Sequence, residues 1–178
     1  MNIKYIALLV VGLGIAITVS GCGSPPSQIP SEPLATPALH SPIPDDFQRY
    51  SVPKHGFEIG YPADWKIVAE HWVSPTVDSP IQLMANFENE SATQSFAVEI
   101  SDSGYNEFAK AYLRDKVSNE DIEVNGYPVM LVKDSYNQLY YIFTNPNDTD
   151  VRVVFVAPAE TTDPALIDQV LATFKFVG

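Results

Sequence analysis

The sequence predicts an α+β domain in which a curved antiparallel sheet packs between helices. Most of the chain after residue 56 consists of segments with an apolar residue at every second position, which is the pattern of half-buried strands. A segment of helical period interrupts them at 101–117, and a second one follows at 161–177. An Asn-Gly pair between two apolar runs predicts a hairpin, so we expect neighbouring strands to pair antiparallel.

Extended segments come first in the domain. In GFEIGYP (56–62), aromatic and aliphatic residues alternate with polar or small ones, and the final proline ends the strand. The segments WKIVAEHWV (65–73), IQLMANFE (81–88) and SFAVEIS (95–101) are the next candidates. Turn-rich pieces containing Ser-Pro pairs separate them. We therefore expect four strands before the first helix.

The period changes to that of an amphipathic helix at 101–117. The apolar residues of one helical face are Tyr105, Phe108, Ala109, Tyr112 and Leu113. Asp102 or Ser103 is available as an N-cap, and basic residues gather toward the C-terminal end, where the helix dipole favours them. We expect this helix to cover the sheet.

A hairpin and two more strands follow this helix. Asn125 and Gly126 both tolerate the positive φ that a tight hairpin turn requires. The apolar runs QLYYIFT (138–144) and VRVVFVA (151–157) are the next strands, and the polar residues NPNDTD join them. We interpret that joining segment as a hairpin loop, because it lacks the glycine and the distal glutamate of a calcium-binding loop.

The segment 161–177 predicts a closing helix. Asp163 can cap it, and Pro164 stands at the first helical position, where its missing N–H costs nothing. The buried stripe consists of Leu166, Ile167, Val170, Leu171 and Phe174.

The beginning of the chain predicts where in the cell the protein is located. Residues 5–19 are almost all apolar and follow Lys4, which fits a signal peptide and is too short for a comfortable membrane span. The four residues VSGC that end at Cys22 resemble the bacterial lipobox. That resemblance implies that residues 1–21 are removed and that Cys22 becomes a lipid-bearing first residue, with acyl chains such as palmitate. The alternative is a secreted protein with a spare cysteine beside an ordinary cleavage site.

A proline-rich segment separates Cys22 from the predicted domain at 49–178. Residues 22–48 contain closely spaced prolines and few large apolar residues, so we expect an extended, partly polyproline tether. The segment could instead be a proline-rich ligand, but it lacks the repetition of one. The lipid on Cys22 would therefore hold the domain to the membrane, on the extracytoplasmic side of a cell envelope or a thylakoid.

Charge and cysteine content limit the partners. The formal net charge of the 178-residue chain is -12, and losing Lys4 with the signal peptide makes it -13. Such a domain repels nucleic acid, because phosphate binding needs clustered Lys and Arg. Cys22 has no second cysteine to pair with, so stability must come from the core. We expect a monomer that binds no nucleic acid.

The sequence offers little for catalysis, so we expect no enzyme. It contains no nucleophile elbow, zinc-protease motif or phosphate-binding glycine loop. His55 and His71 are the candidate metal ligands of the domain. If the sheet brought them together with Glu58 or Glu70, imidazole and carboxylate would suit zinc or manganese. The alternative is that the two histidines sit independently at the surface.

Three segments resemble PsbP-like domains. The opening YSVPKHGFEIGYPADWKI (50–67) has their Gly-Phe, alternating strand and Tyr-Pro-x-x-Trp, in which Trp65 would fill the core. The hairpin IEVNGYPV (122–129) and the terminal DPALIDQVLATFKFV (163–177) are also of their kind. The resemblance covers nearly all of 50–177, and it implies a PsbP/Mog1-like α/β/α sandwich.

The same resemblance implies a function. A lipid-anchored cyanobacterial member of the family associates with photosystem II on the lumenal side. We therefore expect a non-enzymatic accessory protein that docks on or stabilises a membrane complex, which would be photosystem II if the source is a cyanobacterium. The alternative is a metal- or small-solute-binding lipoprotein. A large closed apolar cavity with convergent polar groups would favour solute binding, and a smooth acidic face with exposed aromatic residues would favour docking.

Overall fold

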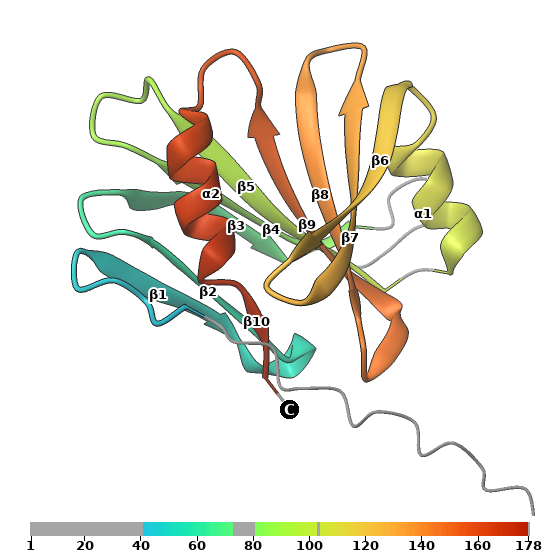
Figure 1. Cartoon of the computed structure of the whole chain (residues 1–178), viewed down its shortest axis with the longest axis horizontal. Helices are drawn as coiled ribbons and strands as arrows, with labels where there is room; N and C mark the ends of the chain where they lie inside the picture. Colours follow the sequence, from blue (N-terminus) through green and yellow to red (C-terminus); the bar gives the residue numbers. More distant parts are fainter. Residues whose placement is uncertain (1–40, 73–80, 103, 178) are drawn as a thin grey trace, which may run out of the picture. The chain divides into compact units, whose positions relative to one another are not determined.

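The computed structural model describes residues 41–72, 81–102 and 104–177. These residues form two antiparallel sheets and two α-helices (Figure 1). Cys22, the signal peptide and most of the predicted tether lie outside the described residues. The strands are β1 (Phe47–Val52), β2 (Phe57–Pro62), β3 (Lys66–Trp72), β4 (Ile81–Glu88), β5 (Ser95–Ser101), β6 (Lys116–Val124), β7 (Tyr127–Asp134), β8 (Gln138–Asn145), β9 (Asp148–Pro158) and β10 (Lys175–Phe176).

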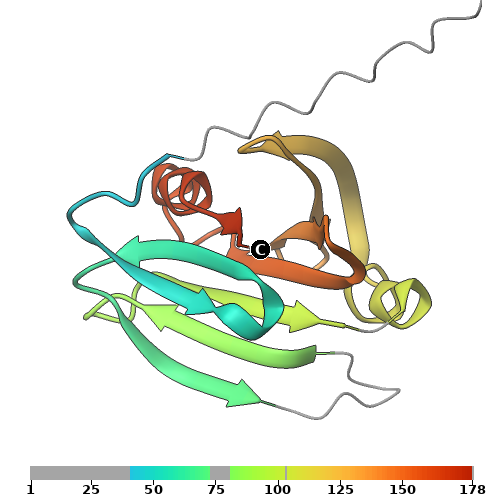
Figure 2. The same ribbon diagram turned by 90° about the horizontal axis from the view of Figure 1, so that it is seen from below.

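The described part of the chain is mostly β, so the expected α+β sandwich with its sheet between helices is wrong. Seven strands form one sheet in the order β3-β4-β5-β9-β8-β7-β6, and β1-β2-β10 form a separate sheet. The large sheet curls around the small sheet and α2 (Pro164–Ala172), and α1 (Tyr105–Tyr112) lies outside the curl (Figure 2). A second sheet therefore occupies much of the face where we expected only helix.

The reason for this error is the pairing of the first strands. Residues 47–62 fold back as the antiparallel hairpin β1–β2, and β2 pairs with β10 on its other side. Alternation shows which face of a strand is buried, but it does not identify the neighbouring strand. The alternating segment 57–62 was therefore recognised as a strand and assigned to the wrong sheet.

The main core lies between the two sheets and is rich in aromatic rings. Phe96 stacks on Phe87 and on Phe155 at centroid distances of 4.6 and 4.7 Å. Trp65 lies 5.6 Å from Phe96 and is only 6% exposed, which confirms that it fills the core. Phe174, from the segment before β10, stacks on Phe57 at 6.0 Å and so joins the small sheet to α2.

A smaller core lies on the opposite face of the large sheet, under α1. Its buried residues are Phe108, Tyr112, Val132, Ile142 and Val154. The helix is shorter than predicted, because Gly104 is its N-cap and Leu113 its C-cap, and β6 begins at Lys116. The N-cap residue is Gly104 and not the predicted Asp102, and the other predicted cap, Ser103, lies outside the described residues.

Helix α2 begins as predicted. The side chain of Asp163 accepts a hydrogen bond of 2.9 Å from the N–H of Ala165, and Pro164 is the first helical residue. Ile167, Val170 and Leu171 are buried. The cap and the apolar stripe together fix where this helix starts and which face it buries.

The Asn125-Gly126 turn has a second role that the sequence did not predict. Both residues have positive φ, 53° and 77°, as the predicted hairpin turn requires. The side-chain Nδ2 of Asn125 also donates to the carbonyl oxygens of Leu171 and Ala172 at 2.9 Å and of Phe174 at 3.1 Å. The tip of the β6–β7 hairpin therefore caps the C-terminal end of α2.

The folded domain begins slightly before the predicted boundary at residue 49. Strand β1 starts at Phe47, whose N–H bonds to the carbonyl of Pro44 at 3.0 Å. The carbonyl of Asp46 accepts from Ala63 at 2.8 Å. The last residues assigned to the tether are thus part of the domain.

Candidate functional site

His55, one of the two predicted metal ligands, is buried. It ends η1 (Pro53–His55), a short 3-10 helix between β1 and β2, and it is 7% exposed. Its ring stacks on the indole of Trp72 at a centroid distance of 5.7 Å and an angle of 22°. The ammonium of Lys54 lies 5.7 Å from the centre of the same indole.

The second predicted ligand, His71, faces away from His55. It lies on β3, where Trp72 pairs with Leu83 and His71 pairs with Met84. Leu83 belongs to the main core, so Trp72 is on that face of the sheet and His71, its neighbour, is on the other. The structure therefore does not bring the two imidazoles together.

The predicted carboxylate ligands are also engaged elsewhere. Buried Glu58 forms ion pairs with Lys175 at 2.7 Å and with Arg49 at 3.5 Å. Burial raises the pKa of Tyr50, and the charge of nearby Glu70 raises it further. Among the described residues, no three His, Cys, Asp or Glu side chains gather closely enough to hold a metal ion.

The environment of His55 disfavours the protonated ring. Burial lowers the pKa of His55, the charge of Lys54 lowers it further, and Asp102 acts in the opposite direction. Its Nε2 is buried and makes no hydrogen bond within the part of the chain that the structure describes. The buried ring gives Trp72 a flat surface to stack on.

Trp72 is the last residue of β3, an edge strand of the large sheet, and it is 52% exposed. One face of its indole is covered by His55, and Lys54 is close by. Lys54, His55 and Trp72 form what we call the Trp72 surface. A large aromatic side chain that is held in place and half exposed is typical of a binding surface.

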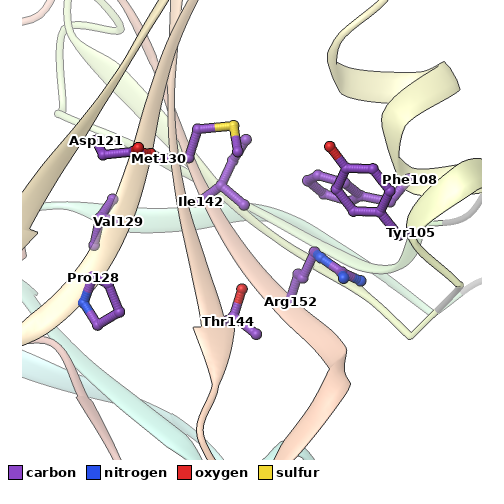
Figure 3. A pocket seen from close by; sticks show the side chains of 9 residues that line it. All are labelled: Tyr105, Phe108, Asp121, Pro128, Val129, Met130, Ile142, Thr144 and Arg152. Carbon is purple, nitrogen blue, oxygen red and sulfur yellow. The ribbon is translucent and has the colours of Figure 1, made fainter. Parts of the chain in front are cut away.

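A cleft of about 330 Å³ lies beside α1, on the face of the large sheet opposite the main core (Figure 3). Helix α1 forms one wall, and strands β6 to β9 form the rest. The lining residues are Tyr105, Phe108, Asp121, Pro128, Val129, Met130, Ile142, Thr144 and Arg152. We call this hollow the α1 cleft.

Arg152 is the buried cation of the α1 cleft. It is 8% exposed, and its guanidinium carbon lies 4.9 Å from the ring centre of Phe108 and 5.7 Å from that of Tyr105. Its Nη1 donates to the carbonyl of Asp150 at 3.2 Å. The aromatic faces stabilise the charge by cation–π attraction and shield it from water.

The other polar residues lie at the two ends of the α1 cleft. Thr144 of β8 is the cross-strand neighbour of Arg152 of β9. Asp121 stands on the edge strand β6, opposite Met130 of β7. Ile142 and Met130 lie between them, so the cleft has a cationic end, an apolar middle and an anionic rim (Figure 3).

A buried hydrogen bond holds α1 against the sheet next to this cleft. The hydroxyl of Tyr112 donates to Oε2 of Glu99 at 2.6 Å. Burial raises the pKa of Glu99, and the hydrogen bond from Tyr112 only partly opposes this. Tyr112 also stacks on Phe108, the residue that covers Arg152.

The α1 cleft is not among the sites that the sequence predicts. The signal was the position of Arg152 within the apolar run VRVVFVA, where a strand buried on both faces would rarely carry a cation without a partner. The partners, Tyr105 and Phe108, were recognised only as an apolar helical face. Strand β9, which carries Arg152, lies close to α1 because it pairs with β5, the strand that precedes α1. Alternation within a strand does not reveal this pairing.

Comparisons with known proteins give no family. Neither a family model nor a curated protein matches the chain. A crystal structure from Bacteroides thetaiotaomicron VPI-5482 is similar with a TM-score of 0.46 and 14% identity, over 75% of this chain and 49% of that chain. This chain thus spans about half the length of that protein. Within the described residues, no helix is long and apolar enough to cross a membrane.

Proposed function

We propose that this protein is a lipid-anchored, non-enzymatic, extracytoplasmic accessory protein that docks on a membrane complex and stabilises it. The four residues VSGC at 19–22 support the anchor, and the proline-rich segment after them supports a tether. A coiled tether of about 25 residues would span roughly 30 Å, which is enough to clear the lipid headgroups. The folded domain would then meet its partner from the membrane surface.

The observation that carries the docking role is the Trp72 surface. Tryptophan is enriched among the residues that dominate binding energy, because it buries a large area with few rotatable bonds. Stacking on His55 already restricts the indole of Trp72, so docking would cost little further side-chain entropy. Lys54 adds a positive charge beside it in an otherwise acidic chain. A partner with an apolar pocket rimmed by carboxylates fits this surface.

The identity of the complex depends on the source. The segments 50–67, 122–129 and 163–177 resemble PsbP-like domains, so photosystem II is the proposed partner if the source is a cyanobacterium. In another bacterium, the same anchor and surface would serve a different complex of the cell envelope. The described part of the domain is the same in both cases, and only the partner differs.

The anchor is tested by replacing the lipid-bearing residue. We expect wild-type protein to incorporate labelled palmitate and to fractionate with membranes. Cys22→Ser should lose the label and should not yield the processed membrane form. Unlabelled wild-type protein that still fractionates with membranes would contradict the proposal.

Docking is tested by affinity purification from detergent-solubilised membranes. We expect the full-length tagged protein to retain a membrane complex in stoichiometric amounts and Trp72→Ala to lose it. Tyr136→Ala is the matched control, because Tyr136 is a 74% exposed aromatic residue outside the Trp72 surface. Equal recovery of the complex with both variants would contradict a role for Trp72.

A further inference from the structure

We propose that a hollow on the outer face of the small sheet binds a singly charged phosphodiester, and that a lipid headgroup is its source. The hollow has a volume of about 390 Å³. It is lined by residues 41–43 and by Arg49, Glu58, Thr173 and Lys175. We call it the entry pocket, because residues 41–43 lead the chain into β1. The phosphodiester chemistry is independent of the proposed function, whereas the choice of a headgroup rests on the proposed anchor at Cys22.

Strand pairing places three charged side chains on one face of the small sheet, in which β1, β2 and β10 lie side by side (Figure 1). Arg49 of β1 lies two residues before Ser51, which pairs with Glu58 of β2. Glu58 pairs in turn with Lys175 of β10. Paired residues, and residues two apart in a strand, share a face of the sheet. Tyr50, the neighbour of Arg49, belongs to the main core, so the charged side chains are on the outer face.

The carboxylate of Glu58 holds two cations beside each other. Its Oε1 lies 2.7 Å from Nζ of Lys175, and its Oε2 lies 3.5 Å from Nη1 of Arg49. Glu58 is buried, while the side chains of Lys175 and Arg49 are 34% and 60% exposed. An ammonium has three donors and a guanidinium has five, so one carboxylate leaves most of them available. The three side chains carry a net charge of +1.

This charge balance suits a phosphodiester. The planar fork of Arg49 can donate two hydrogen bonds to the two free oxygens of a phosphodiester, and Lys175 adds a point charge beside them. The single negative charge of the diester balances the net charge of the three side chains, whereas a dianion would leave an excess charge next to Glu58. The chain as a whole carries -12. At physiological salt, exposed charges more than about 8 Å away are largely screened, so the nearby cations dominate.

The wall formed by residues 41–43 depends on Gly60. A Cβ at this position would lie 3.2 Å from Cγ2 of Ile43 and 3.0 Å from Oγ1 of Thr173. Glycine therefore lets Ile43 lie against the backbone of β2, where it gives the pocket an apolar side for the ester groups of a ligand. The volume of the pocket is within the range of small-molecule sites and exceeds what a bare anion fills.

The position of the entry pocket favours a headgroup as the source. Ser41, which lines the pocket, is 19 residues after Cys22, the proposed lipid-bearing residue. If these residues form a coiled tether, they have a root-mean-square span of about 25 Å and also reach shorter separations. The lipid anchor would thus keep headgroup phosphates at a high effective concentration around the pocket.

The chemistry is tested by calorimetric titration of the full-length Cys22→Ser chain, which can carry no lipid, in a neutral maltoside detergent. The probe is glycerophosphoglycerol, a soluble phosphodiester with one negative charge. Its comparators are glycerol, the monocarboxylate glycerate and inorganic sulfate. We expect no binding of glycerol and at least fivefold weaker binding of glycerate and sulfate, because one lacks the ester groups and the other adds a second charge.

The source is tested with the same chain in maltoside micelles that contain phosphatidylglycerol or phosphatidylcholine. The apolar residues 5–19 should insert into either micelle. We expect phosphatidylglycerol to bind at least tenfold more tightly than glycerophosphoglycerol, and phosphatidylcholine to bind more weakly because its choline repels the two cations. Equal affinity for the lipid and the soluble diester would overturn the headgroup assignment and leave a free phosphodiester as the ligand.

Substitutions assign the binding to the entry pocket. Arg49→Gln, at an exposed position, leaves Lys175 paired with Glu58 and should weaken probe binding at least fivefold. Arg49→Lys keeps the charge and should retain most of the binding. Lys66→Gln is the matched control, because it removes an equal charge from exposed β3, outside the pocket. Lys175→Gln should also weaken binding, and if it does not fold, the Arg49 variants decide.

Three outcomes would overturn the proposal: no binding of glycerophosphoglycerol, equal binding of glycerate, or equal losses in Arg49→Gln and Lys66→Gln. Arg49→Gln should still retain the membrane complex in affinity purification, and Trp72→Ala should still bind the probe. A protein that binds the probe and fails to dock would refute the docking role alone. A protein that docks and ignores the probe would refute this inference alone.

Discussion

Tyr112 and Glu99 are joined by a hydrogen bond of 2.6 Å between a phenolic hydroxyl and a buried carboxylate oxygen. The bond links α1 to β5, near the centre of the large sheet. Burial raises the pKa of Tyr112, and the nearby charge of Glu99 raises it further. Because the carboxylate of Glu99 is buried beside the apolar residues under α1, this contact is sensitive to pH.

Glu99→Gln should stabilise the protein at pH 7 and not near pH 4. The pKa of Glu99 is raised in the folded state, so the folded protein binds this proton more tightly than the unfolded chain does. The resulting stabilisation is complete below the unfolded pKa, about 4.3, and is lost as pH rises through the raised folded pKa. Glutamine stays neutral throughout. Urea midpoints from pH 4 to 8 measure the difference, with the exposed Glu90→Gln as control. A difference that does not change with pH would contradict this assignment.

Tyr112→Phe should cost about 1 to 3 kcal/mol at pH 7, because it leaves the Glu99 carboxylate buried without its donor. Stacking on Phe108 at 4.7 Å should survive, since the ring is kept. The same substitution in a Glu99→Gln background should cost less, because a neutral amide is cheaper to leave buried. A double-mutant cycle on the free energy of unfolding measures the coupling. Additive losses would show that the two side chains do not interact energetically.

Trp65→Ala should cost about 3 to 5 kcal/mol, as large truncations in a core do. Trp65 is buried against Phe96, and a close-packed core relaxes only partly around such a truncation. Trp72→Ala is the matched control and should cost about 1 kcal/mol, since Trp72 is half exposed. Urea unfolding of both variants gives the comparison. Equal shifts in the two midpoints would mean that the core is not where the structure places it.

Asn125→Asp should destabilise the domain more than Asn125→Gly. Glycine keeps the positive φ and loses only the three hydrogen bonds to the end of α2, a loss of about 1 to 2 kcal/mol. Aspartate also directs a carboxylate at carbonyl oxygens that already carry the negative end of the helix dipole. Thermal melting of the two variants provides the test. A more stable aspartate variant would exclude the capping role.

Zinc and manganese should not stabilise the domain more than magnesium does. His71 lies on β3 and faces away from the main core. His55 lies in η1, on the other side of that strand, where it is buried against Trp72. An acidic chain attracts divalent ions diffusely, so magnesium is the control for that effect. Melting temperatures with each ion give the measurement. A zinc- or manganese-selective rise of several degrees that disappears in a His55→Ala, His71→Ala double variant would establish a metal site.

The sequence predicted the elements of this fold better than their arrangement. Alternation located β2, β4 and β5, and Asp163 located the start of α2, because these signals depend on a few neighbouring residues. Strand β1 went unrecognised, since FQRYSV has little alternation and its pairing with β2 comes from chain reversal at η1. Assignment of strands to two sheets depends on contacts between distant segments, which local pattern does not contain.

The candidate sites also depend on contacts between distant segments, which local sequence pattern does not reveal. The sequence locates both histidines within the domain, but their separation depends on where η1 places His55 and on which face of β3 His71 occupies. A β-bulge between Ile67 and Ala69 shifts the register of that strand, and no residue type in the segment predicts it. Arg152 was overlooked because its aromatic cover is supplied by α1, more than 40 residues earlier in the chain.

The pairing of β10 with β2 also determines when the domain can fold. Lys175 pairs with Glu58 and Phe176 with Phe57, so the small sheet cannot be completed before the chain is available up to residue 176. Phe174, which directly precedes β10, belongs to the main core. A nascent chain lacking these residues would expose the inner face of β2, and we expect it to remain unfolded during synthesis. The small sheet is therefore expected to close only after synthesis has passed residue 176, and not while the preceding strands are emerging.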